Sequence, residues 1–229
     1  MVQYVSDELF HFVGRHESRF EKKFELLTKI LSNGTLLSSR QSKSSGGIAS
    51  QERITSGELA KIAAICFCDI PRSLLDIHTQ KYSKFGLSFT KRFLSSRGAK
   101  PVIYIPLKSQ ATKGKGTRGE ETPKRLRQVI NGLIQLKGSK TKAGSNLASQ
   151  WEFLTDEFYY FIKMFDEDLP QDHLKNYYME REWRLVGGPT RTQLNFSLDD
   201  VHAVMVPKGF RHKLLSEFKS LGNRVLNAP

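Results

Sequence analysis

Short apolar runs of strand length, separated at irregular intervals by helical stretches, are the feature that most constrains the fold of this chain. A regular alternation of strand and helix would indicate a doubly wound sheet, whereas an irregular order is typical of α+β folds. The runs predicted as strands are Leu9–Val13, Thr35–Ser38, Ile62–Asp69, Phe85–Thr90, Val102–Ile105, 180–186 and Val201–Val206. The 229 residues suffice for one large domain. We therefore expect a single α+β domain over residues 1–229.

Apolar residues at helical spacing mark several segments between these strands. The first helix is predicted from a set with intervals of four, three and four: Phe20, Phe24, Leu27 and Leu31. Further helices are predicted after Pro71, around Phe93, over 123–136 and over 209–220. The aromatic stripe from Trp151 to Phe165 also has helical spacing, and we expect it to face the core. Ile62–Asp69, by contrast, is continuously apolar, which is the pattern of a strand buried on both faces.

Two stretches depart from this pattern of elements. Residues 39–57 are rich in Ser and Gly without periodicity, which predicts a flexible surface loop. Residues 108–148 form a basic insert with one expected helix. Between Lys108 and Lys142 only Glu120 and Glu121 oppose the basic residues, and this stretch supplies most of the net charge of +13.

The basic insert predicts a polyanionic partner, because Lys and Arg side chains that contact phosphates release bound counterions. The residues we expect to contact nucleic acid are Lys113, Lys115, Arg118, Lys124, Arg125 and Arg127. Aromatic side chains are missing from the stretch itself. The alternative is a solvated insert that serves solubility alone, and composition leaves both interpretations open.

Several functional classes are disfavoured by what the sequence lacks. There is no apolar run of membrane-spanning length, and the first residues carry no secretory h-region, so we expect a cytoplasmic protein. Cys66 and Cys68 form no Cys-x-x-Cys pair and have no nearby His, which predicts reduced thiols and no zinc site. Glycine-rich phosphate-binding motifs and the nucleophile elbow are absent. We expect no bound metal.

The candidate chemistry lies in the segment Tyr178-Met179-Glu180-Arg181-Glu182-Trp183-Arg184. If this segment is a strand, Glu180 and Glu182 share one face, about 6 to 7 Å apart at the backbone. Two carboxylates on one face repel each other unless a cation or a polar ligand faces them, which favours a functional site. Arg184 lies on the same face and offers a structural alternative, a salt bridge with Glu182.

His11 lies in the middle of the first predicted strand, between Phe10 and Phe12. A histidine flanked by aromatic residues is more often a satisfied core or edge residue than a functional one. From the residues alone, His11 is therefore a weaker candidate than the carboxylate pair.

Several of these pieces together resemble a known family. The order Leu-Phe-His-Phe-Val, Cys-Phe-Cys-Asp-Ile-Pro, Lys-Phe-Gly-Leu-Ser-Phe-Thr-Lys, Pro-Val-Ile-Tyr-Ile and Glu-Arg-Glu-Trp-Arg-Leu-Val is similar to the AbiGi family of bacterial abortive-infection antitoxins. The resemblance runs from about residue 8 to 206. It implies a role in phage defence, within a toxin–antitoxin system that stops the growth of infected bacteria, and therefore a cognate toxin or antitoxin protein as partner.

The layout also resembles, more distantly, the ADP-ribosyltransferase-like superfamily. That resemblance implies split mixed β-sheets flanked by helices, NAD as substrate, and transfer of ADP-ribose to nucleic acid or a translation protein. Glu182 would stabilise the oxocarbenium ion and Glu180 would orient the acceptor. The remaining residues that it implies hold NAD: His11, Ser88, Thr90, Tyr82 and Phe85.

Two hypotheses of different classes follow. The first is an NAD-dependent ADP-ribosyltransferase that uses Glu182, Glu180 and His11. The second is an antitoxin or nucleic-acid-binding protein that keeps the fold without chemistry. They differ in whether His11, Ser88 and Glu182 meet in one cleft, or whether Glu182 is closed against Arg184.

Overall fold

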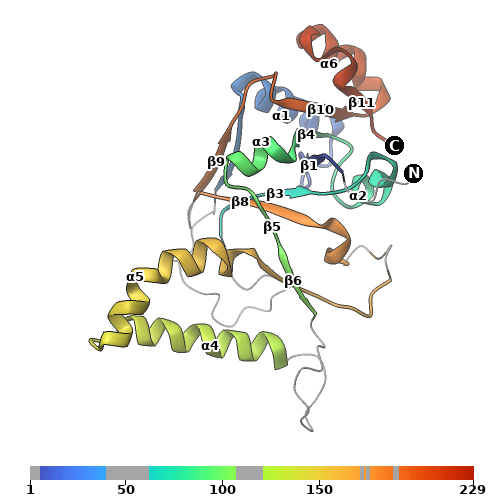
Figure 1. The fold of residues 1–229 in the computed structure, drawn as a ribbon. Helices are drawn as coiled ribbons and strands as arrows, with labels where there is room; N and C mark the ends of the chain where they lie inside the picture. The colour runs from blue at the N-terminus through green and yellow to red at the C-terminus, as the bar shows by residue number, and fades with distance from the viewer. Residues whose placement is uncertain (1–5, 40–61, 107–120, 171–172, 174–175, 188–190) are drawn as a thin grey trace. The chain divides into compact units, whose positions relative to one another are not determined.

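Strands and helices follow one another irregularly in the structure, a computed structural model that describes residues 6–39, 62–106, 121–170, 173, 176–187 and 191–229. The expected α+β class is confirmed (Figure 1). Backbone contacts divide the chain into two compact units. Unit 1 comprises Met1–Arg40, Ala63–Pro101 and Glu180–Pro229, and unit 2 comprises Gln41–Ile62 and Val102–Met179. The 39–57 loop lies outside the described residues, except for Ser39.

Unit 1 is built on a seven-stranded sheet with the order β11-β10-β4-β1-β3-β8-β5 (Figure 1). Its strands are β1 (Glu8–Phe12), β3 (Ala64–Cys68), β4 (Gly86–Thr90), β5 (Lys100–Pro101), β8 (Glu182–Val186), β10 (Val201–Val206) and β11 (Val225–Asn227). β10 and β11 run parallel, and the other neighbours are antiparallel, so the sheet is mixed. A second, two-stranded sheet pairs β2 (Thr35–Ser39) with β9 (Arg191–Asn195).

Helices pack on both faces of the seven-stranded sheet. They are α1 (Phe20–Asn33), the 3-10 helix η1 (Arg72–Leu74), α2 (Leu75–Lys81), α3 (Lys91–Ser96), the 3-10 helix η4 (Lys208–Phe210), α6 (Arg211–Glu217) and the 3-10 helix η5 (Lys219–Arg224). α1, α3 and α6 contribute buried side chains to the larger hydrophobic core. Leu75 of α2 belongs to a smaller core on the opposite face. We call the two sides the major-core face and the minor-core face.

Strand alternation assigns each sheet residue to a face. Leu9 and Leu87 belong to the major core, whereas Phe10 belongs to the minor core. Phe10 is in register with Ser88, and Cys68 with Glu182. Residues in register on antiparallel strands share a face, so Ser88 and Glu182 point to the minor-core face.

Unit 2 contains a helical hairpin and a small parallel sheet. Its elements are β6 (Ile103–Pro106), α4 (Glu121–Lys137), α5 (Lys142–Glu157), the 3-10 helix η2 (Tyr159–Phe161) and β7 (Ile162–Phe165), followed by the 3-10 helix η3 (Tyr177–Glu180), which ends at the first residue of unit 1. β6 pairs with β7, and α4 contacts α5. None of the described helices is long and apolar enough to cross a membrane.

Two predictions about elements were wrong in part. The stripe from Trp151 to Phe165 is not one helix, because α5 ends at Glu157 and β7 begins at Ile162. Phe158, expected to face the core, is 47% exposed in the turn between them. Ile62–Asp69 does form a strand, but Cys66 on it is exposed, so β3 is not buried on both faces.

Candidate functional site

Glu182 is closed against Arg184. Both residues lie on β8 two positions apart, and Arg184 Nε donates a hydrogen bond to Glu182 Oε1 at 2.7 Å. Each side chain is only 3% exposed. The carboxylate expected to stabilise an oxocarbenium ion is therefore buried in an ion pair with its own strand neighbour.

Glu180 does not share a strand with Glu182, and the expected pair on one strand face is wrong. β8 begins only at Glu182, and Glu180 ends the 3-10 helix η3. Arg181 between them has φ of 39°, the only positive φ outside glycine among the described residues. This left-handed residue interrupts the alternation on which the prediction depended.

Glu180 instead belongs to a buried polar cluster with the end of α2. Lys81 Nζ lies 2.5 Å from Glu180 Oε1, and the Tyr82 hydroxyl donates a hydrogen bond to the same oxygen. The Lys81 and Glu180 side chains are 8% and 4% exposed. Burial raises the pKa of the Tyr82 phenol far above its ordinary value, and the Glu180 carboxylate raises it further. Tyr82 is therefore a neutral hydrogen-bond donor to Glu180.

The Tyr82 ring lies in a small aromatic stack. Its centroid is 5.5 Å from Phe12 and 6.4 Å from His78, and the Arg15 guanidinium lies 4.9 Å above it. Burial lowers the pKa of His78, an effect that the nearby Glu180 carboxylate opposes. His78 is buried and its Nδ1 makes no hydrogen bond within the described residues.

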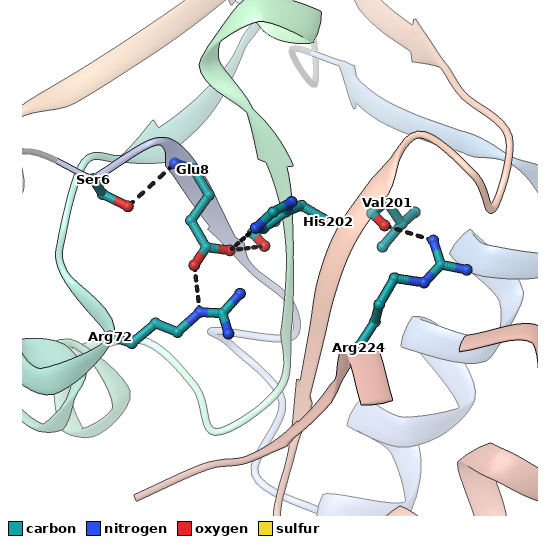
Figure 2. A network of polar contacts seen from close by, with 7 residues as sticks. Ser6, Glu8, Arg72, Val201, His202 and Arg224 are labelled. Atoms are coloured by element: carbon teal, nitrogen blue, oxygen red, sulfur yellow. Dashed lines mark hydrogen bonds and ion pairs between the residues drawn. The ribbon is translucent and has the colours of Figure 1, made fainter. Parts of the chain in front are cut away.

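Glu8, which the sequence did not single out, is the centre of another polar network (Figure 2). Its carboxylate accepts hydrogen bonds from Arg72 Nε and from the Ser88 hydroxyl. His202 Nε2 approaches the same carboxylate at 4.0 Å, and the Glu8 amide donates to Ser6 Oγ at 3.2 Å. A signal for Glu8 exists in the sequence: it occupies the same face of β1 as Phe10, so an acidic residue is directed inward there.

Asp69, directly after β3, lies against two basic side chains. Its carboxylate lies 2.7 Å from Lys91 Nζ and 3.7 Å from Arg181 Nη2, and it accepts a hydrogen bond from the Ser6 amide at 3.3 Å. Ser6 thus bridges Asp69 and Glu8. The only sequence signal for Asp69 is its position at the end of an apolar run.

His11 points to the other face of the sheet from Ser88 and Glu182. It is in register with Leu87 of the major core, and its ring lies 5.7 Å from Phe67. Its Nδ1 makes a 2.8 Å hydrogen bond with the Cys66 carbonyl oxygen. Burial lowers the pKa of His11, which favours the neutral ring.

The residues expected to hold NAD are dispersed. Ser88 and Glu182 share a face, but two strands lie between β4 and β8, a spacing of about 14 Å. Thr90 caps α3, with its Oγ1 accepting a hydrogen bond from the Phe93 amide at 3.2 Å. Phe85 is fully buried in the major core. Binding of NAD stays a prediction.

Most of the residues expected to contact nucleic acid are not among those whose side chains the structure describes. Lys113, Lys115 and Arg118 fall in the undescribed segment 107–120. Lys124 and Arg127 lie on α4, but only the neighbouring Arg125 has a described side chain, which is exposed. Within the described residues, no group of three or more His, Cys, Asp and Glu side chains could hold a metal ion.

The buried acidic residues of unit 1 thus follow one rule. Glu8, Asp69, Glu180 and Glu182 are each at most 7% exposed. Each lies against at least one basic side chain, as the contacts above show. The charge of each of these buried carboxylates is therefore neutralised locally by a cation.

Comparison with known proteins gives one match. Residues 44–206, well over half of the chain, match a family model with the description "Putative abortive phage resistance protein AbiGi, antitoxin". Among curated proteins no significant match was found, and none was found among solved structures.

Proposed function

The chain belongs to the AbiGi family, and from this premise we propose that it acts as the antitoxin of a bacterial abortive-infection system, which binds a cognate toxin protein and performs no chemistry of its own. Such a protein would hold the toxin inactive until phage infection releases it. The family description supports the antitoxin role, and the match covers β3, β4, β5, β8 and β10 of the sheet.

The observation that carries the non-catalytic part of the proposal is the Glu182–Arg184 pair. A carboxylate that stabilises a developing cation must reach the substrate. Glu182 is 3% exposed and accepts a 2.7 Å hydrogen bond from Arg184. His11, on the opposite face of the sheet, is not placed to act with it.

Growth of bacteria that express the chain tests this proposal. We expect no growth arrest from the chain alone, and relief of growth arrest when it is co-expressed with the toxin of its own defence system. The double variant Glu182→Leu/Arg184→Met removes both charges of this pair together, which avoids the cost of leaving one of them alone. This variant should still neutralise the toxin.

The opposite results would identify the chain as an enzyme. Growth arrest by the chain alone, abolished by Glu182→Gln and accompanied by NAD consumption in the parent only, would overturn the proposal. Toxin neutralisation that is lost in a folded Glu182→Leu/Arg184→Met variant would also contradict it, because the buried pair would then serve function and not structure.

A further inference from the structure

An aromatic cluster on the major-core side of unit 1 reaches the surface between α1 and η4. The Phe210 ring lies 5.2 Å from Phe24 and 5.2 Å from Phe85, and the Phe20 ring lies 5.7 Å from Phe85. Phe24 and Phe85 are buried, whereas Phe20 is 42% exposed. A rigid, anchored base therefore supports an aromatic side chain that solvent reaches.

Lysine side chains lie over two rings of this cluster. Lys23 Nζ lies 5.9 Å from the Phe20 ring centroid, and Lys213 Nζ lies 4.8 Å from that of Phe24. Lys208, one residue before Gly209 in η4, is exposed. Within the described part of the chain none of these three lysines has a carboxylate partner. Lys22 on the same helix differs, because it pairs with Glu25.

Lysines around an exposed aromatic ring, without a carboxylate partner among the described residues, suit phosphate and base better than they suit protein. Lysine is depleted at protein–protein interfaces, whereas Lys contacts to phosphates supply most of the affinity for nucleic acids. An exposed ring offers a base a surface on which to stack, and this is possible only where the base is not already stacked in a duplex. The net charge of +13 favours association with any polyanion.

We propose that this surface, formed by Phe20, Lys23, Lys208, Phe210 and Lys213, binds single-stranded nucleic acid, with phosphates on the lysines and a base on Phe20. The residues of this site belong to unit 1, whereas the basic insert belongs to unit 2. The site is also separate from the buried ion pairs, and it does not depend on toxin binding.

Fluorescence anisotropy tests the proposal. The ligands are labelled oligothymidylate and oligouridylate of about 12 nucleotides, a length within the site size of known single-strand binders. Binding is measured between about 50 and 200 mM salt. Lys23→Gln/Lys213→Gln should weaken binding about tenfold or more, and should reduce the slope of log K against log salt by roughly 1.4. Phe20→Leu keeps an apolar side chain against Phe85 and should weaken binding roughly tenfold by removing the stacking surface.

A control with the same change in charge separates the site from general electrostatics. Lys22 and Lys29 are exposed, lie seven residues apart on another stripe of α1, and are replaced together in Lys22→Gln/Lys29→Gln. This control should retain at least most of the affinity and the parental slope. Equal losses in both double variants, or no binding by the parent, overturn the proposal.

Two further outcomes decide the class of partner. Tighter binding to a duplex of the same length, with no effect of Phe20→Leu, would contradict the single-stranded assignment. Dependence on Lys23 and Lys213 that appears only with an acidic protein, and not with the oligonucleotides, would also overturn it. Toxin neutralisation by the same variants is measured separately, so failure here leaves the proposed antitoxin function as it stands.

Discussion

At the scale of residues, unit 1 pairs its buried carboxylates with cations because a lone charge in the interior is costly. Glu182 with Arg184 and Glu180 with Lys81 show this most directly, since both partners in each pair are less than a tenth exposed. The sequence predicted the first pair as the structural alternative for this strand. It could not predict the second, because Lys81 lies 99 residues from Glu180 and only the tertiary fold brings them together.

Removing one member of the Glu182–Arg184 pair should destabilise the protein strongly. Glu182→Ala removes the carboxylate that accepts a hydrogen bond from the buried Arg184 guanidinium, and we expect the free energy of unfolding to fall by about 3–5 kcal/mol. Replacing both residues in Glu182→Leu/Arg184→Met should restore most of that loss. Urea unfolding measures all three free energies.

An exposed ion pair on α1 is the control for this measurement. Lys22 and Glu25 have side chains 45% and 58% exposed, so Lys22→Ala should lower the free energy of unfolding by less than about 1 kcal/mol. A similar cost for Glu182→Ala and Lys22→Ala would show that the buried pair contributes no more than a surface pair.

His78 should make stability depend on pH. Burial lowers the pKa of His78 in the folded protein, despite the Glu180 carboxylate, while Lys81 adds to the lowering. The unfolded chain then takes up the proton first, near its ordinary pKa of about 6.5. Stability from the neutral ring is therefore present above that pH and is lost as pH falls below it.

The variant His78→Phe keeps a ring beside Phe12 and Tyr82 but removes the titrating group. Its free energy of unfolding should fall less steeply between about pH 7 and pH 5 than that of the parent. A residual slope is expected, because burial also lowers the pKa of His11. Identical slopes for parent and variant would contradict the assignment.

At the scale of elements, local signals in the sequence predicted most boundaries in unit 1. The spacing of Phe20, Phe24, Leu27 and Leu31 predicted α1, and Gly34 ends it in the left-handed conformation. The prediction of one helix from Trp151 to Phe165 was wrong because helical and strand patterns look alike over a few apolar residues. β7 is a strand because it pairs with β6, and no local pattern in the sequence indicates that pairing.

Gly34 is required at its position for two independent reasons. Its φ is 59°, and a Cβ atom there would lie 2.4 Å from the Phe196 carbonyl oxygen. Gly34→Ala should therefore lower the free energy of unfolding by more than about 1 kcal/mol. Gly209 has no atom within 4 Å of a Cβ position, and Gly209→Ala should change stability by about 0.5 kcal/mol or less. Thermal and urea unfolding compare the two, and equal effects would contradict the requirement.

At the scale of the whole molecule, the two hydrophobic cores that the described residues form belong to unit 1. Every residue of the major and minor cores lies in Met1–Arg40, Ala63–Pro101 or Glu180–Pro229. The sequence predicted five strands of the sheet, but not β5 or β11. It also did not predict the strand order, since β1 lies between β3 and β4 only through pairings far apart in the chain. This distribution of core residues predicts that unit 1 folds by itself.

Replacing Val102–Met179 by a short Gly/Ser linker tests independent folding. β5 pairs with β8, with Pro101 in register with Trp183, so the two ends of the excised segment leave and enter the sheet on neighbouring strands. Strands in register are about 4.8 Å apart, and a few flexible residues can join them.

The shortened chain should unfold in one cooperative urea transition, because the sheet, both cores and the Glu182–Arg184 pair are retained. Glu182→Ala should cost the same in the shortened and full-length chains, within about 0.5 kcal/mol, because its partner Arg184 lies in unit 1. A shortened chain without a cooperative transition would show instead that unit 2 contributes to the stability of the sheet.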